Sequence, residues 1–176
     1  MATAADWLAR FEHAEVRFCL RANRSCERAP VLALFATVSR LGDGVFWYAL
    51  MLALPLLYGA AGATVSVQMA LAGLLGTAVY RWLKQRLVRE RPCNLHPRIS
   101  AGARALDRYS FPSGHTLHAV SFTIIVTAAF PALAFALVPF AALVAMSRVI
   151  LGLHYPSDVV AGALLGFVLA RLALLA

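Results

Sequence analysis

Charged side chains are scarce in this chain. Only 14% of its 176 residues are Asp, Glu, Lys or Arg, whereas 61% are hydrophobic and the mean hydropathy is +0.75. Soluble domains carry about 25% charged and about 45–50% apolar residues. A core of this size cannot hide so much apolar surface, so we expect lipid to solvate part of it.

Acidic residues are scarcer still, since 8 Asp and Glu stand against 16 Lys and Arg and leave a net charge of +8. A basic chain can bind nucleic acid, anionic lipid or phosphate substrates. We expect no nucleic-acid partner, because the charges lie between apolar runs of membrane length. A positive-inside flank accounts for the N-terminal arginines. It accounts less well for the dense basic cluster at residues 81–91.

Cysteine is also rare, and the spacing of Cys19, Cys26 and Cys93 matches no metal-binding pattern. We therefore assign these thiols no chemistry, and we expect no metal and no other cofactor. The segment Met1–Arg28 is charged throughout, so we expect no cleavable signal peptide and insertion through the chain's own helices.

Apolar runs alternate with short polar breaks along the chain. A membrane span needs about 20 residues, or somewhat fewer where the bilayer thins. The pattern predicts an all-α polytopic membrane helix bundle with five transmembrane helices, or six if residues 28–41 also cross. The five predicted spans are residues 45–60, 63–83, 115–130, 132–147 and 157–175.

The N-terminal segment 5–24 mixes Trp, Phe and Leu with Arg and Glu. This pattern favours an amphipathic helix in the bilayer interface, with a soluble surface helix as the alternative. We expect one membrane-embedded domain over residues 1–176, with no room for a further soluble domain. The interfacial helix would take residues 1–27 and the bundle residues 28–176. Polar motifs fall at residues 84–92, 112–115 and 147–158, and the alternation of spans predicts that these three segments meet at one membrane face.

The first polar segment runs from Lys84 to Pro92. If the preceding helix continues to about Glu90 and stops before Pro92, Lys84 and Arg91 lie two turns apart on one face and suit a phosphate. Arg86 and Arg89 would then point away towards lipid headgroups. A basic interfacial flank is the alternative interpretation of the whole segment.

The second segment, Phe111 to His115, opens a helix. Ser113 can cap it, and Gly114 lets a ligand approach the free N–H groups, which favour an anion. His115 beside that anion suits proton transfer near neutral pH. An ordinary capped helix start is the alternative. His118, one turn further on, is expected mainly to pack.

The third segment runs from Ser147 to Asp158. Arg148 ends one helix and Pro156 is well placed as the first residue of the next. Asp158 can then orient one ring nitrogen of His154 and leave the other as a nucleophile. The alternative is that Asp158 only complements the helix dipole. Ionisable groups at the membrane edge are costly, which favours a functional role.

Together the segments read Lys-x6-Arg-Pro, Pro-Ser-Gly-His and Ser-Arg-x5-His-x3-Asp over residues 84–158. This signature resembles the type-2 phosphatidic acid phosphatase (PAP2) superfamily, in particular its bacterial membrane lipid phosphatases. The resemblance implies that His154 is the nucleophile, Asp158 its partner and His115 the acid for the leaving oxygen. It implies that Lys84, Arg91, Ser113, Gly114 and Arg148 hold the phosphate without a metal.

The expected function is therefore hydrolysis of a lipid phosphate ester through a phosphohistidine. Undecaprenyl diphosphate is the first expected substrate, followed by phosphatidylglycerophosphate and phosphatidate. A lipid phosphotransferase with the same site is the alternative, while a non-catalytic lipid-binding protein would be expected to lack a catalytic residue. Membrane lipids are the expected surroundings, and no signal for an oligomeric state is present. If residues 28–41 cross, the positive-inside rule places the site on the periplasmic or outer face of a bacterial inner membrane.

Overall fold

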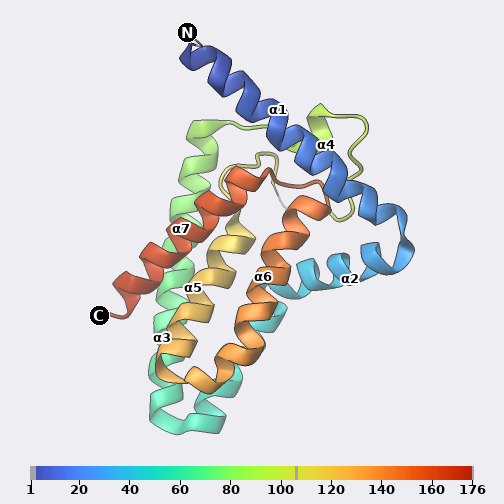
Figure 1. Ribbon diagram of the computed structural model, residues 1–176. Coiled ribbons are helices and arrows are strands. Elements are labelled where there is room, and N and C mark those ends of the chain that lie inside the picture. The colour runs from blue at the N-terminus through green and yellow to red at the C-terminus, as the bar shows by residue number, and fades with distance from the viewer. Residues whose placement is uncertain (1–2, 106, 176) are drawn as a thin grey trace.

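The computed structural model describes residues 3–105 and 107–175 (Figure 1). Within these ranges the regular elements are helices, apart from one isolated bridge between Glu90 and Tyr109. The predicted all-helical class is therefore confirmed. The α-helices are α1 (Ala4–Asn23), α2 (Ala29–Arg40), α3 (Phe46–Leu87), α4 (Pro92–Leu95), α5 (Gly114–Ala129), α6 (Ala134–Ile150) and α7 (Pro156–Ala173). Short turns η1 (Arg24–Glu27), η2 (Leu41–Val45) and η3 (Pro131–Leu133) join some of them.

Helix α3 consists of two legs that meet at Gly59, where φ is +57° and the helical geometry breaks. Figure 1 shows these legs as a hairpin at the lower end of the bundle. Ser66 in the second leg donates a hydrogen bond to the carbonyl of Met51 in the first, at 2.8 Å. A side chain at Gly62 would collide with the carbonyl of Leu54. The two apolar runs predicted on either side of Gly59 are thus antiparallel and in close contact.

The core of the bundle lies between α3, α5, α6 and α7. Trp47, at the start of α3, is 1% exposed and its ring meets Phe122 of α5 and Phe140 of α6 at centroid distances of 5.4 and 5.5 Å. The outward faces are apolar too, with Leu56 and Phe135 almost fully exposed. Helices that are hydrophobic all round are typical of a membrane bundle.

Within the described residues, three helical segments are long and apolar enough to cross a membrane: Ala29–Leu87, Pro131–Ile150 and Pro156–Ala173. The shorter Gly114–Ala129 is also apolar. Because Ala29–Leu87 contains both legs of α3, these helices include an apolar helical segment at each of the five predicted spans. Helix α2 runs across the bundle in Figure 1 instead of along it.

Helix α1 lies over the end of the bundle at which α3 ends and α5 and α7 begin (Figure 1). One face leaves Trp7, Phe11 and Phe18 exposed, as an amphipathic helix should. The other face is fixed to the bundle. Its Asn23 donates to the carbonyls of Ser100 and Ile150, each at 2.9 Å, and accepts from the N–H of Ser100.

Candidate active site

The first basic segment leaves the helix earlier than the sequence indicates. Helix α3 ends at Leu87, and Val88 adopts a left-handed conformation with φ of 37°. The prediction that the helix continues to about Glu90 was therefore wrong, and Lys84 and Arg91 do not share a helical face. The chain turns at Val88, and the backbone N–H of Ser110 donates a hydrogen bond to the carbonyl of Arg89, which holds the chain against the 107–110 segment of the loop. This turn brings Arg91 back beside Lys84.

Lys84 and Arg91 meet at the carboxylate of Asp107. Oδ1 of Asp107 lies 2.7 Å from Nζ of Lys84 and 2.5 Å from Nη2 of Arg91. Burial opposes ionisation of Asp107, but the hydrogen bond from Lys84 and the two positive charges outweigh it and lower the pKa of the carboxyl. Asp107 is thus an anion between two buried cations, in the place where the sequence predicted a phosphate.

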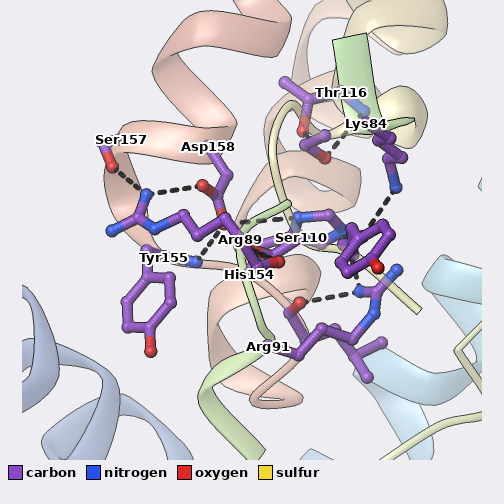
Figure 2. A network of polar contacts seen from close by, with 12 residues as sticks. Lys84, Arg89, Arg91, Ser110, Thr116, His154, Tyr155, Ser157 and Asp158 are labelled. Carbon is purple, nitrogen blue, oxygen red and sulfur yellow. Dashed lines mark hydrogen bonds and ion pairs between the residues drawn. The ribbon is translucent and has the colours of Figure 1, made fainter. Parts of the chain in front are cut away.

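Arg91 also connects this pair of cations to the third motif. Its Nη1 donates to the carbonyl of Leu153 at 2.7 Å and lies 3.2 Å from Nε2 of His154 (Figure 2). The side chain of Arg91 is only 3% exposed. Its guanidinium therefore faces the ring nitrogen that the sequence predicted as the nucleophile.

The second motif begins α5 as predicted. Ser113 is the N-cap and accepts a hydrogen bond from the N–H of Thr116 at 3.4 Å, while its hydroxyl lies 2.9 Å from Oγ1 of Thr116. Ser113 is fully buried, so its hydroxyl serves the cap and does not line the cavity described below. Gly114 and His115 do line it, and Nε2 of His115 lies 3.3 Å from Oδ1 of Asp43 in η2.

The third motif contributes two buried groups to the site. Arg148, in the last turn of α6, donates to the hydroxyl of Ser39, while its Nε is buried and has no hydrogen-bond partner among the described residues. Pro156 is at the first turn of α7, as predicted. Burial, with the charges of Arg148, Arg91 and Lys84, lowers the pKa of His154 well below its ordinary value. The imidazole is therefore neutral at neutral pH.

Asp158 lies close to His154 without a hydrogen bond between them. Nδ1 of His154 is 3.6 Å from Oδ2 of Asp158 and, within the described part of the chain, has no hydrogen-bond partner. Oδ2 instead accepts the N–H of Tyr155 at 2.8 Å. Hydrogen bonds of catalytic groups are often long in the absence of substrate, so the pair is poised for the predicted contact.

Arg89 belongs to this site, which corrects the expectation that it points to lipid headgroups. Its Nη1 lies 2.6 Å from Oδ1 of Asp158 and 2.7 Å from the hydroxyl of Ser157 (Figure 2). Its Nη2 lies 2.7 Å from Oε2 of Glu15, and its guanidinium covers the Tyr155 ring at 4.1 Å. The two carboxylates outweigh burial and raise the pKa of Arg89.

Glu15 connects helix α1 to the same cluster. It is 5% exposed, and its second oxygen accepts the N–H of Ser157 at 2.7 Å. The periodicity of 5–24 indicated an amphipathic helix, and in such a pattern Glu15 is one acidic residue among several. A glutamate on the buried face of α1 is the signal that could have pointed to a buried cation.

One cavity of about 480 Å³ brings most of the predicted residues together. It is lined by Lys84, Arg91, Gly114, His115, Arg148 and His154 from the three motifs. Asp43 and Asp107 line it as well, and the sequence analysis assigned neither of them a role. Ser113 and Asp158 lie behind its wall, both fully buried. The predicted convergence of the three motifs is thus observed.

His118 lies further along the same cavity wall. Its Nε2 is 3.2 Å from the carbonyl of Gly73 and 3.4 Å from the hydroxyl of Thr77. Its ring stacks on Phe122 at a centroid distance of 5.4 Å. These contacts agree with the packing role that the sequence favoured, although the ring also faces the cavity.

The arrangement of these motifs agrees with the protein family that the chain matches. The family model of the PAP2 superfamily matches residues 62–176, which include all three motifs. The chain belongs to the PAP2 superfamily. This PAP2 chain resembles two solved membrane proteins, each with a TM-score of 0.76.

One of these structures is the PAP2-type phosphatidylglycerolphosphate phosphatase from Bacillus subtilis. It is 22% identical, and the match covers 93% of this chain and 84% of that one. The other is Aquifex aeolicus LpxE, which is 23% identical, with 91% and 94% covered. At these identities the likeness establishes the fold. Together with the apolar helices, it makes this PAP2 chain an integral membrane protein.

Among curated relatives, decaprenylphosphoryl-5-phosphoribose phosphatase of Mycolicibacterium smegmatis is 38% identical over 82 residues, 46% of this chain and 42% of the relative. Lipid A 1-phosphatase of Rhizobium etli is 33% identical over 111 residues, 60% of this chain and 45% of the relative. The matched segments thus span less than half the length of these two relatives.

Proposed function

We propose that this PAP2 protein is a lipid phosphatase that hydrolyses a phosphate ester through a phosphohistidine intermediate. The observation that carries the proposal is the neutral, buried His154, whose Nε2 lies 3.2 Å from Arg91 in a cavity shared with Lys84 and Arg148. A neutral imidazole has a lone pair on Nε2, which faces Nη1 of Arg91 here and becomes available for attack when the phosphate oxygens bind that guanidinium. The adjacent cations can neutralise the phosphate oxygens as charge moves in the transition state.

In the first step, Nε2 of His154 forms a bond to phosphorus while the bond from phosphorus to the leaving oxygen breaks. The imidazolium of His115 donates a proton to that oxygen and becomes neutral. The lipid leaves as an alcohol from a monoester, or as a lipid monophosphate from a diphosphate. In the second step a water molecule gives a proton to His115 and attacks phosphorus. The P–N bond breaks, and inorganic phosphate is released with His154 neutral again. Each step conserves atoms and charge, because every bond that forms replaces one that breaks.

The remaining motif residues are assigned supporting roles. Asp158 holds Nδ1 of His154 as positive charge builds on the ring. Arg148 offers its unpaired Nε to a phosphate oxygen, which supports a site for a further acceptor. The N–H of Gly114 lies at the start of α5, where a helix favours an anion. Ser113 contributes by holding that helix start.

The proposed substrate is a lipid that reaches the cavity from the membrane. The names of the Mycolicibacterium and Rhizobium relatives refer to phosphates on prenyl-linked ribose and on lipid A, which supports a lipid phosphate here. The candidates from the sequence, undecaprenyl diphosphate, phosphatidylglycerophosphate and phosphatidate, remain to be compared. We further propose a bacterial inner membrane location. Helix α1 contacts the active-site end of the bundle through Glu15, so its arginines lie on the same side as the site and do not support the predicted periplasmic or outer face.

The test is phosphate release by the purified full-length protein in detergent, with these three lipids and a soluble phosphomonoester. We expect release from at least one lipid, in the presence of EDTA, with competitive inhibition by vanadate. His154→Ala should abolish release, whereas Glu27→Gln, an exposed acidic residue outside the cavity, should not. An acid-labile phosphoryl group should be trapped on wild-type protein only. Wild-type turnover by His154→Ala would refute the mechanism, and transfer to a second lipid without free phosphate would indicate a phosphotransferase.

A further inference from the structure

A second acidic residue, Asp43, lines the cavity beside the proposed proton donor. It lies in η2 (Leu41–Val45), between α2 and α3, and its side chain is 37% exposed. Its Oδ1 is 3.3 Å from Nε2 of His115. None of the three motifs includes Asp43, and in the sequence the segment around it reads only as a turn.

The turn holds this carboxylate in place through the glycines on either side. Gly44 has φ of +127°, a conformation that other residues rarely adopt. A side chain at Gly42 would lie 2.8 Å from Cγ2 of Val144 in α6, so this position must approach the bundle without a Cβ. The backbone around Asp43 is therefore fixed, and the carboxylate is directed at the cavity by the fold.

The charged residues of the cavity act on both proposed catalytic histidines. The charges of Lys84, Arg91 and Arg148 act on His154, where the transferred phosphate would bind, whereas the carboxylate of Asp43 lies beside His115 and is also close enough to interact with Arg148. In an in-line displacement the leaving oxygen lies opposite the nucleophile. His115 is the proposed donor to that oxygen, so Asp43 is on the leaving-group side. A carboxylate there accepts hydrogen bonds from hydroxyl groups and repels a second phosphate.

The same cavity also carries neutral polar groups, from Tyr48, Thr77 and Tyr80. These suit a hydroxylated glycerol or sugar. Arg81 also lines the cavity, but its side chain is exposed. It is the charged group that could instead receive a second phosphate, and for that reason it enters the test.

We propose that Asp43 is a specificity-determining residue that selects lipid phosphate monoesters with a hydroxylated leaving group over lipid diphosphates. The inference rests on the proposed function and narrows it. This selectivity reverses the order of the candidate substrates expected from the sequence, because the leaving group of undecaprenyl diphosphate carries a phosphate. Phosphatidylglycerophosphate has a glycerol hydroxyl beside the bond that breaks.

The experiment measures kcat/KM for phosphatidylglycerophosphate and for undecaprenyl diphosphate with purified full-length protein. The wild type should favour the monoester by about tenfold or more, which corresponds to about 1.4 kcal/mol. Asp43→Asn keeps the shape and removes the charge, so the ratio should fall at least severalfold, mainly through faster diphosphate turnover. Asp43→Leu removes the acceptor as well and should slow the monoester. Glu27→Gln is the matched control for charge.

The outcomes separate this inference from the function on which it rests. If the wild type releases phosphate from no lipid, the proposed function fails. If it is active but Asp43→Asn leaves the ratio unchanged, or slows both substrates equally, Asp43 acts on His115 alone and the selection is refuted. A wild-type preference for diphosphate that Arg81→Gln abolishes would assign the leaving-group side to a second phosphate.

Discussion

Nη1 of Arg89 lies 2.6 Å from Oδ1 of Asp158, although 69 residues separate them in the chain. Asp158 is fully buried, and its other oxygen accepts the N–H of Tyr155. The carboxylate is therefore held from two sides, with His154 3.6 Å away. Removing one partner of a buried ion pair leaves an uncompensated charge, so the position of Asp158 depends on Arg89.

Arg89→Ala should lower kcat of phosphate release by on the order of tenfold or more, because Asp158 loses the cation that orients it. Arg89→Lys should restore part of the rate, since an ammonium keeps the charge but cannot span Asp158 and Glu15 as a guanidinium fork does. The exposed Arg86, which stacks on Trp82, provides the control variant Arg86→Ala. A shift of the acid limb of the pH profile in Arg89→Ala would distinguish positioning from a loss of folding. Unchanged kcat and pH profile would contradict the role.

The pH dependence of activity follows from the charge around His154. Burial and the surrounding cations lower its pKa below the ordinary value of 6.5, and the neutral form is the proposed nucleophile. Activity is lost as pH falls through this pKa, so the acid limb of kcat/KM should lie below pH 6.5. The charged or titratable groups that surround His154 are Lys84, Arg91, Asp107, His115, Arg148 and Asp158.

Replacing Lys84 by Met should move that limb to higher pH, because one positive charge no longer opposes protonation of His154. The measurement is kcat/KM from pH 4.5 to 8 on a substrate that both proteins turn over. An acid limb above pH 6.5 in the wild type would contradict a lowered pKa of His154. A limb that moves to lower pH in Lys84→Met would contradict the effect assigned to the charge of Lys84.

The carboxylate of Asp107 forms ion pairs with Lys84 and Arg91, the cations that a phosphate would need. It should therefore compete with the substrate for these two side chains. Asp107→Asn should strengthen inhibition by vanadate severalfold, because Lys84 and Arg91 no longer have a carboxylate partner at 2.7 and 2.5 Å. Glu27→Gln should leave the inhibition constant unchanged. Weaker inhibition in Asp107→Asn would mean that the carboxylate organises the cations for the ligand instead of competing with it.

The contact between α5 and α7 leaves no space for a side chain at Gly162, where a Cβ would collide with the carbonyl of Ser113. Gly162→Ala should therefore destabilise the protein by about 1–3 kcal/mol, as overpacking generally does. It should also separate the helix that carries His115 from the one that carries Asp158. Thermal unfolding in detergent measures the first effect and kcat the second. Val160→Ala, at an exposed position of α7, should change neither by much. A melting temperature like that of the wild type would show that the helices can move apart freely.

The sequence by itself determined the class of the fold and the chemistry of the motifs. Apolar runs of membrane length form helices because lipid offers their backbone groups no other partners. Ser113 caps α5 and Pro156 begins α7, as local rules for helix ends require. The motif residues Lys84, Arg91, His115, Arg148 and His154 could be selected because their types and spacings match a known signature.

The further charged residues of the site could be identified only from the tertiary structure. Helix α3 ends at Val88 through contacts with the 107–110 segment, and local propensity contains no signal for that end. Arg89 thereby turns to Asp158 and Glu15, Asp107 reaches Lys84 and Arg91, and Asp43 reaches His115. The physical reason is that partners in buried ion pairs are chosen by packing, across separations in the chain at which no periodicity relates one residue to another.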